Sequence, residues 1–207
     1  MRRFGYLFLI LLSLLLSSCK ERIMSISEIE KKDGFYYEKL FKKKYTGKAI
    51  SMTEDEEWIF KEGELIEYSK YYKNRKLNQE LKFKNNVLDG IIKFYHPNGQ
   101  LKSETMWENG KIKDGITNQY HENGKLAAIE TYKNGELNGM FKSYHSNGQL
   151  KFETMWENGK IKDGIIKSYS ENGEVMGREI FKNGIMIKKE EISKWKRTLL
   201  KKKIIIS

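Results

Sequence analysis

The most constraining feature of this 207-residue chain is a segment that is written twice. The nineteen residues from Asn98 to Ile116 return from Asn147 to Ile165, and only one position differs, Ser103 in the first copy and Phe152 in the second. A reaction centre is normally needed once, whereas a repeated segment is typical of a building unit that stacks on its neighbours. The duplication therefore predicts a repeat architecture.

Glycines set the length of the unit. They recur at alternating intervals of 11 and of 13 or 14 residues, each directly after an asparagine: Gly99, Gly110, Gly124, Gly135, Gly148, Gly159, Gly173 and Gly184. Asn-Gly between short apolar stretches predicts a two-residue type I′ hairpin turn, which needs positive φ at both positions. A similar spacing continues upstream with less regular turn residues, at Asn85-Asn86, at Asn74-Arg75 and within Lys61–Leu65.

The stretches between the turns alternate with a period of two. From Leu101 to Trp107, apolar or small residues occupy the odd positions, and Lys, Glu and Met occupy the even ones. A helix is disfavoured because a glycine interrupts the pattern in every unit. We therefore predict an all-β fold, an elongated single-layer antiparallel meander sheet of repeated β-hairpins in which each unit contacts only its neighbours.

Two series of aromatic residues accompany the turns. The series are Tyr95, Tyr120, Tyr144 and Tyr169, and Trp107, Tyr132, Trp156 and Phe181. A single-layer sheet has no second layer to bury against, so we expect these rings to form cross-strand ladders and to offer a binding face. Gly90, Gly115, Gly139 and Gly164 precede the next strand, where they allow either a bend or the close approach of a ring.

The N-terminus has the form of an export signal. Two arginines precede an apolar run from Phe4 to Leu16, which is short for a membrane span, and small residues follow. Leu16 to Cys19 resembles a bacterial lipobox, and Cys19 is the only cysteine. The resemblance implies cleavage before Cys19 and its acylation, which anchors the protein to a membrane. Lys20 is not aspartate, and by the same resemblance the outer membrane is favoured in a cell that has two membranes.

We divide the chain into a signal peptide (1–18), a tether (19–35) with a short helix near Ser25–Lys32, the hairpin repeats (36–187) and a basic tail (188–207). For the tail, two interpretations remain open. Ile192, Trp195, Leu199 and Leu200 could share one face of a short amphipathic helix on a lipid or protein surface. Alternatively, the lysine-rich tail covers the last edge of the sheet.

The stretch from Tyr120 to Gly139, YHENGKLAAIETYKNGELNG, resembles the bacterial variant of the MORN repeat. Tyr36 to Ile50 is similar to the start of such proteins. The resemblance covers roughly Tyr36 to Lys188, and it implies an elongated single-layer sheet of hairpins. Members of this group are often described as YwqK-like antitoxin components, and many are lipoproteins.

Residues that could support chemistry recur with the repeat and do not form a single cluster. His96, His121 and His145 each follow a unit tyrosine. Equivalent positions lie two strands apart, roughly 9.6 Å, which is too far for one shared metal, and we expect exposed histidines beside the turns. The glycine loop and aspartate motifs of a kinase are missing. We therefore expect a protein that is not an enzyme, with no cofactor and no metal.

The function we expect is that of a lipid-anchored scaffold in the cell envelope that binds a protein partner. A net charge of +11 favours contact with an anionic surface, and we do not expect nucleic acid to be the partner. Two alternatives stay open: an antitoxin or immunity protein that masks a toxin, and a direct binder of anionic lipid or cell-wall polymer.

Overall fold

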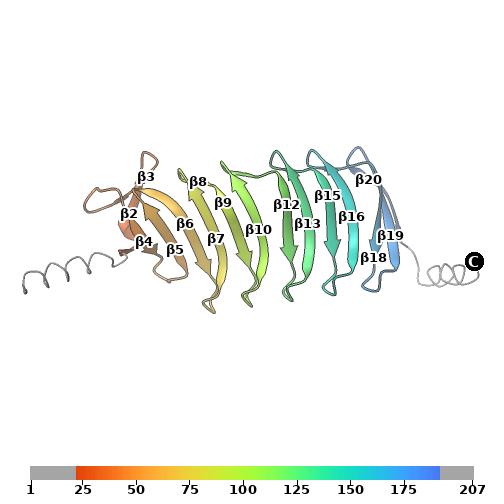
Figure 1. Cartoon of the computed structure of the whole chain (residues 1–207), viewed down its shortest axis with the longest axis horizontal. Helices are drawn as coiled ribbons and strands as arrows, with labels where there is room; N and C mark the ends of the chain where they lie inside the picture. The colour runs from red at the N-terminus through yellow and green to blue at the C-terminus, as the bar shows by residue number, and fades with distance from the viewer. Residues whose placement is uncertain (1–21, 192–207) are drawn as a thin grey trace, which may run out of the picture.

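The structure is a computed structural model, and it describes residues 22–191 (Figure 1). The described chain is an elongated, open 18-stranded sheet together with a separate two-stranded sheet. The predicted signal peptide lies outside the described residues, as do Cys19 and the tail from residue 192 onward. The predicted all-β meander of hairpins is confirmed.

The large sheet follows the order of the chain from its second strand onward. Its first strands are β1 (Ile23–Ser25), β4 (Gly47–Ile50), β5 (Glu56–Lys61), β6 (Glu64–Tyr71), β7 (Leu77–Lys84), β8 (Val87–Leu88) and β9 (Gly90–Tyr95). The middle strands are β10 (Leu101–Glu108), β11 (Lys111–Ile112), β12 (Gly115–Tyr120), β13 (Leu126–Lys133), β14 (Glu136–Leu137) and β15 (Gly139–Tyr144). The last are β16 (Leu150–Glu157), β17 (Lys160–Ile161), β18 (Gly164–Tyr169), β19 (Val175–Lys182) and β20 (Ile185–Glu191). Every pairing is antiparallel except β1 with β4, which is parallel.

Each repeat contains an eight-residue strand that is paired in two steps. The end of β10 pairs with the two-residue β11, and its middle pairs with β12. Between the two steps the chain bends at Gly115, whose φ is +142°. A Cβ at Gly115 or Gly164 would meet nothing within 4 Å, so these glycines serve the bend and do not make room for a ring.

The Asn-Gly turns are of two kinds, and the type I′ prediction is right for only one of them. Asn109 and Gly110 both have positive φ, at 50° and 78°, as a type I′ turn requires. In the other kind only the glycine is left-handed: Gly99 has a φ of 88°, and Asn98 is not among the positive-φ residues. Here Gly99 N bonds to His96 O, and the pairing of β9 with β10 shifts by one residue beside the turn. This is a longer turn with a bulge, and it leaves the asparagine side chain free to bond elsewhere.

The tether prediction for residues 19–35 is wrong from Ile23 onward. β1 pairs with β4, a 3₁₀ turn covers Ile26–Glu28 where a short helix was expected, and β2 (Ile29–Lys32) forms a hairpin with β3 (Phe35–Glu38). The sequence did not predict β2, because its residues are mostly charged and only Ile29 is buried. At the other end, the repeat boundary at 187 is too early, since β20 continues to Glu191.

The main core lies between the β2–β3 hairpin and the first strands of the large sheet, and not in the hairpins that follow β7. It contains Ile29, Tyr45, Ala49, Phe60 and Leu65. Tyr45 is fully buried, and the rings of Tyr36 and Tyr45 lie 4.8 and 5.8 Å from that of Phe60. The sheet therefore has a second layer at its N-terminal end, where a single layer was expected throughout.

Candidate binding surface

The histidines connect successive hairpins at the turns on one end of the strands. His96 Nε2 lies 2.8 Å from the carbonyl oxygen of Tyr120, one repeat further along. His121 and His145 make the equivalent bonds to the carbonyl oxygens of Tyr144 and Tyr169. In the preceding unit Tyr72 takes the same place, and its hydroxyl donates to Tyr95 O at 2.8 Å. The prediction of exposed histidines is therefore wrong: they are half-buried ties between successive repeats.

The asparagines of these turns add a second hydrogen bond between repeats, at the same end of the strands. Asn98 Nδ2 donates to Glu122 O at 2.6 Å, and Asn123 and Asn147 donate to Ser146 O and Glu171 O in the same way. Each asparagine is available for this bond because its own turn is of the bulged kind. Repetition of the sequence thus repeats the bonds between units, which keeps the hairpins in one sheet.

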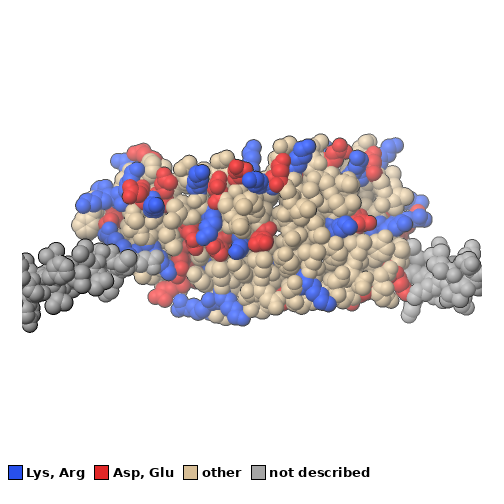
Figure 2. Space-filling model, in the orientation of Figure 1, with Lys and Arg blue, Asp and Glu red and all other residues tan. Residues whose placement is uncertain are grey.

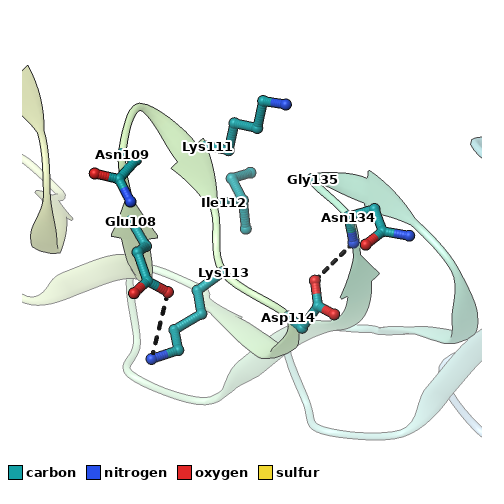
Figure 3. Close-up of a pocket in the computed structure, with 8 residues that line it drawn as sticks. All are labelled: Glu108, Asn109, Lys111, Ile112, Lys113, Asp114, Asn134 and Gly135. Atoms are coloured by element: carbon teal, nitrogen blue, oxygen red, sulfur yellow. Dashed lines mark hydrogen bonds and ion pairs between the residues drawn. The ribbon is translucent and has the colours of Figure 1, made fainter.

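At the other end of the strands, an acidic residue accepts a hydrogen bond from the next turn. Asp114 Oδ1 accepts a hydrogen bond from Asn134 N at 2.6 Å, and Lys113 forms an ion pair with Glu108 at 3.6 Å (Figure 3). These residues line a shallow depression of about 600 Å³. A second depression of about 540 Å³ lies one duplication further on, from Glu157 to Asp163. Both are open, and their carboxylates already have partners, so the depressions are products of the turn geometry.

The predicted aromatic residues are half-buried, and they do not form ring-to-ring ladders. Within residues 22–191, no two of the eight rings make a recorded ring contact with each other. In the second series each ring stands between a glycine on one strand and an aliphatic residue on the other: Trp107 between Gly90 and Ile112, Trp156 between Gly139 and Ile161. The stacked pair in the repeats is Phe141 with Phe152, at 5.6 Å, and Phe152 is the one residue that differs between the duplicated segments.

The face that carries Trp107, Tyr132, Trp156 and Phe181, here called the aromatic face, also holds the buried residues of the repeats. Ile92, Thr117, Ala128 and Thr154 are each at most 8% exposed. The hydroxyl of Tyr132 donates a hydrogen bond to Glu130. Burial together with this carboxylate raises the pKa of Tyr132 to about 12. This face is well packed for a single sheet, and it contributes to stability more than it offers free surface.

The opposite face carries a stripe of exposed aliphatic side chains, which we call the methionine face. Its members come from six strands: Ile91 (44% exposed), Met106 (45%), Ile116 (70%), Met140 (38%), Met155 (41%) and Ile165 (57%). The register places Ile91 opposite Met106 and Met140 opposite Met155. The stripe spans the strands from β9 to β18, about 29 Å at roughly 4.8 Å per strand. The sequence predicted the alternation, but it did not show that this side would be the more exposed one.

A row of charged residues runs beside the methionine face. Glu80 lies opposite Lys93 and Lys93 opposite Glu104, and further along Lys142 pairs with Glu153 at 3.4 Å. Figure 2 shows one side of the molecule, with charged groups gathered over the N-terminal strands and along the edges, and with extensive uncharged surface between them. An apolar stripe with charges of both signs beside it is typical of a protein-binding surface.

Other kinds of site find little support in the described residues. No group of three or more His, Cys, Asp or Glu within residues 22–191 is arranged to hold a metal ion. Across the same residues there is no helix with the length and apolar character needed to cross a bilayer. Cys19, the predicted acylation site, lies outside this range.

Comparison with known proteins identifies the repeat. Residues 88–109, 113–134, 137–158 and 162–183 each match the model of the MORN repeat variant. No curated protein matches the chain. The matched segments fall on the hairpins from β8 to β19, while the hairpins of β4 to β7 continue the same architecture beyond the matched residues. The centre of this sheet is therefore built from four MORN repeat variants.

Proposed function

We propose that this protein is a lipid-anchored, non-enzymatic binding module of the cell envelope that holds a protein partner on its methionine face. The observation that carries the proposal is the exposed aliphatic stripe from Ile91 to Ile165. The stripe is interrupted at β13, where Thr131 lies opposite Ile116. Soluble proteins rarely leave apolar side chains aligned over several strands uncovered unless they bind something. The sheet repeats this surface from unit to unit, which suits an extended contact and not a reaction centre.

A protein fits this surface better than a polymer or a nucleic acid. Methionine is unbranched and adapts its shape to a partner, and three of the six residues in the stripe are methionines. The adjoining row mixes acidic and basic residues and is uncharged in its middle, at Asn118 and Ile129, so it does not concentrate positive charge as a polyanion site would. The net charge of +11 keeps anionic lipid or cell-wall polymer as an alternative ligand.

An antitoxin or immunity role is the specific form of the protein-binding proposal. In that form, the methionine face covers one toxin. A chromosomal deletion that is lethal, and that becomes harmless when a neighbouring gene is lost, would support this role. A harmless deletion would favour a general scaffold.

Crosslinking in intact cells tests the binding surface. A photoactivatable residue at Met155 should capture a discrete protein, while the same residue at Phe94 should capture little. The two positions form a matched pair, because they are 41% and 38% exposed and lie on opposite faces of the sheet. Equal capture at both positions, or capture of lipid alone at Met155, would refute the proposed surface.

The anchor is tested separately by the mass of the mature protein. We expect a chain that begins at Cys19 and carries a diacylglyceryl group and an N-acyl group, and Cys19→Ser should abolish both additions. By the lipobox resemblance, fractionation of a cell with two membranes should place the acylated protein in the outer membrane. A free thiol at Cys19 would remove the lipid anchor from the proposal and leave the binding surface standing.

A further inference from the structure

The loop Lys39–Lys44, here called the lysine loop, has features that the repeats and the core do not explain. It follows β3 and carries two apolar side chains on its exterior, Leu40 (81% exposed) and Phe41 (61%). Both lie outside the core that the β2–β3 hairpin forms with the sheet. The hairpin and its loops project from the N-terminal end of the molecule (Figure 1). Exposing two large apolar side chains to water is unfavourable, and their position at a tip indicates that they contact another surface.

The same loop is strongly basic. Four of its six residues are lysines and none is acidic. Lys42 pairs with Glu30 at 2.6 Å, Lys39 donates to a backbone oxygen of Ser27, and Lys44 lies over the ring of Phe35. Only one of the four charges is therefore recorded with an acidic partner in the described part of the chain. Apolar residues flanked in the sequence by lysines match the interface of an anionic bilayer, where the acyl boundary lies beneath the headgroup charges.

The fold holds this loop next to the proposed anchor. Arg22, the first described residue, forms a two-bond ion pair with Glu38, the last residue of β3 and the neighbour of Lys39. Glu38 is 3% exposed, so the contact is fixed by burial. Cys19 lies three residues before Arg22, and three residues span at most about 11 Å. Acyl chains on Cys19 would therefore keep the lysine loop within reach of the bilayer surface.

We propose that the lysine loop is a second membrane contact, in which Leu40 and Phe41 enter the interface of an anionic lipid bilayer and the four lysines face its headgroups. The inference rests on the proposed anchor at Cys19 for its proximity to the membrane. Two contacts at one end would fix the orientation of the sheet relative to the membrane, which one acylated residue cannot do.

A site-specific fluorescent label tests the contact. The full chain, produced with its own N-terminus, is altered at Phe41→Cys or, as a control, at Met52→Cys, and each cysteine is labelled with an environment-sensitive dye. Met52 is 90% exposed and follows β4 in a loop that contains Glu54 and Asp55, so it is apolar and exposed but lacks the basic surroundings. If Cys19 is acylated, the introduced cysteine is the only thiol, and the unaltered chain takes up no label.

In vesicles of equal parts phosphatidylcholine and phosphatidylglycerol, the label at position 41 should shift to the blue and be quenched by a quencher on the acyl chains. The label at 52 should be quenched mainly from solution. Changing Lys43→Gln should weaken the signal at 41 by about fivefold, because one lysine near an anionic surface contributes about 1 kcal/mol. Vesicles of phosphatidylcholine alone should give a weaker blue shift at 41.

A label at 41 that stays as accessible from water as the label at 52 would overturn the inference, and so would equal insertion into neutral vesicles. Labelling of the unaltered chain would show instead that Cys19 is not acylated. The loop is then read in a Cys19→Ser background, where the same comparison of positions 41 and 52 decides it.

Discussion

At the scale of single residues, the repeats depend on backbone conformations that few side chains accept. Arg75 shows this most clearly, because it has a φ of 65° at the position where Gly99 and Gly124 stand in later units. Sequence reasoning located this turn at Asn74-Arg75, and the structure confirms it through the bond from Arg75 N to Tyr72 O. A left-handed residue other than glycine is strained by roughly 1–2 kcal/mol.

Replacing Arg75 with glycine should therefore stabilise the protein. We expect the free energy of unfolding to rise by about 0.5–1 kcal/mol, since the relief of strain exceeds the added freedom of glycine in the unfolded chain. The ion pair with Glu54 is long and exposed, and its loss should matter little. Denaturant unfolding measures the change, with Arg75→Lys as the control that keeps both charge and strain. A less stable Arg75→Gly variant would contradict this account of the turn.

The aspartate that caps a neighbouring turn gives a second prediction. Asp114→Ala leaves Asn134 N without its acceptor and should lower the free energy of unfolding by about 1 kcal/mol. In the next repeat Asn138 stands in the place of Asp114. Its side-chain amide donates a hydrogen bond to the side chain of Asn158, at 3.2 Å, a contact with a side chain and not with a backbone amide of the turn. Asn138→Ala is therefore the matched comparison, and it should cost clearly less. Equal losses for the two variants would show that the cap contributes nothing specific.

At the scale of elements, the sequence predicted the repeated hairpins well because period-two alternation and Asn-Gly turns are local signals. It could not distinguish the two kinds of turn, since the same Asn-Gly pair serves both, and the difference depends on the residues paired beside it. It also missed the β2–β3 hairpin, which is held by distant contacts such as Tyr36 with Phe60. The alternation placed Trp107, Tyr132, Trp156 and Phe181 on one face, but the predicted ladders are not found. Which face is the more exposed depends on burial across strands, which the pattern does not show.

The last strand should respond to acid. Glu190 on β20 is bonded to Lys188 and to Arg178, and these bonds lower its pKa to about 2. A carboxylate whose pKa is lower in the folded state stabilises that state above its unfolded pKa, near 4.3, and the benefit is lost as the pH falls toward 2.

Hydrogen exchange between pH 5 and pH 2 measures this effect. Corrected for intrinsic rates, amides of β19 and β20 should lose protection relative to those of β12 and β13 as the pH falls. In Glu190→Gln the protection of β20 should be lower at pH 5 and should change less with pH. A protection profile of β20 that is the same in both proteins would show that Glu190 does not hold this strand.

At the scale of the whole molecule, the two ends of the sheet have different tasks from the middle. The N-terminal end has the two-layer core and the lysine loop, and Cys19 precedes it by three residues in the sequence, whereas the middle has the repeats and the methionine face. Successive repeats are joined by the same bonds at the same positions, such as those of His96, His121 and His145. Units that bond only to their neighbours should be interchangeable.

Removal of one duplication tests that claim most directly. Deleting residues 98–146 joins Pro97 to Asn147, so that β9 meets β16 through the turn sequence that β9 already uses. The account predicts a folded, cooperative protein whose maximum dimension in small-angle X-ray scattering is shorter by about 19 Å, the width of four strands. A chain that unfolds, aggregates or keeps its original length would contradict the view that these hairpins are independent, stackable units.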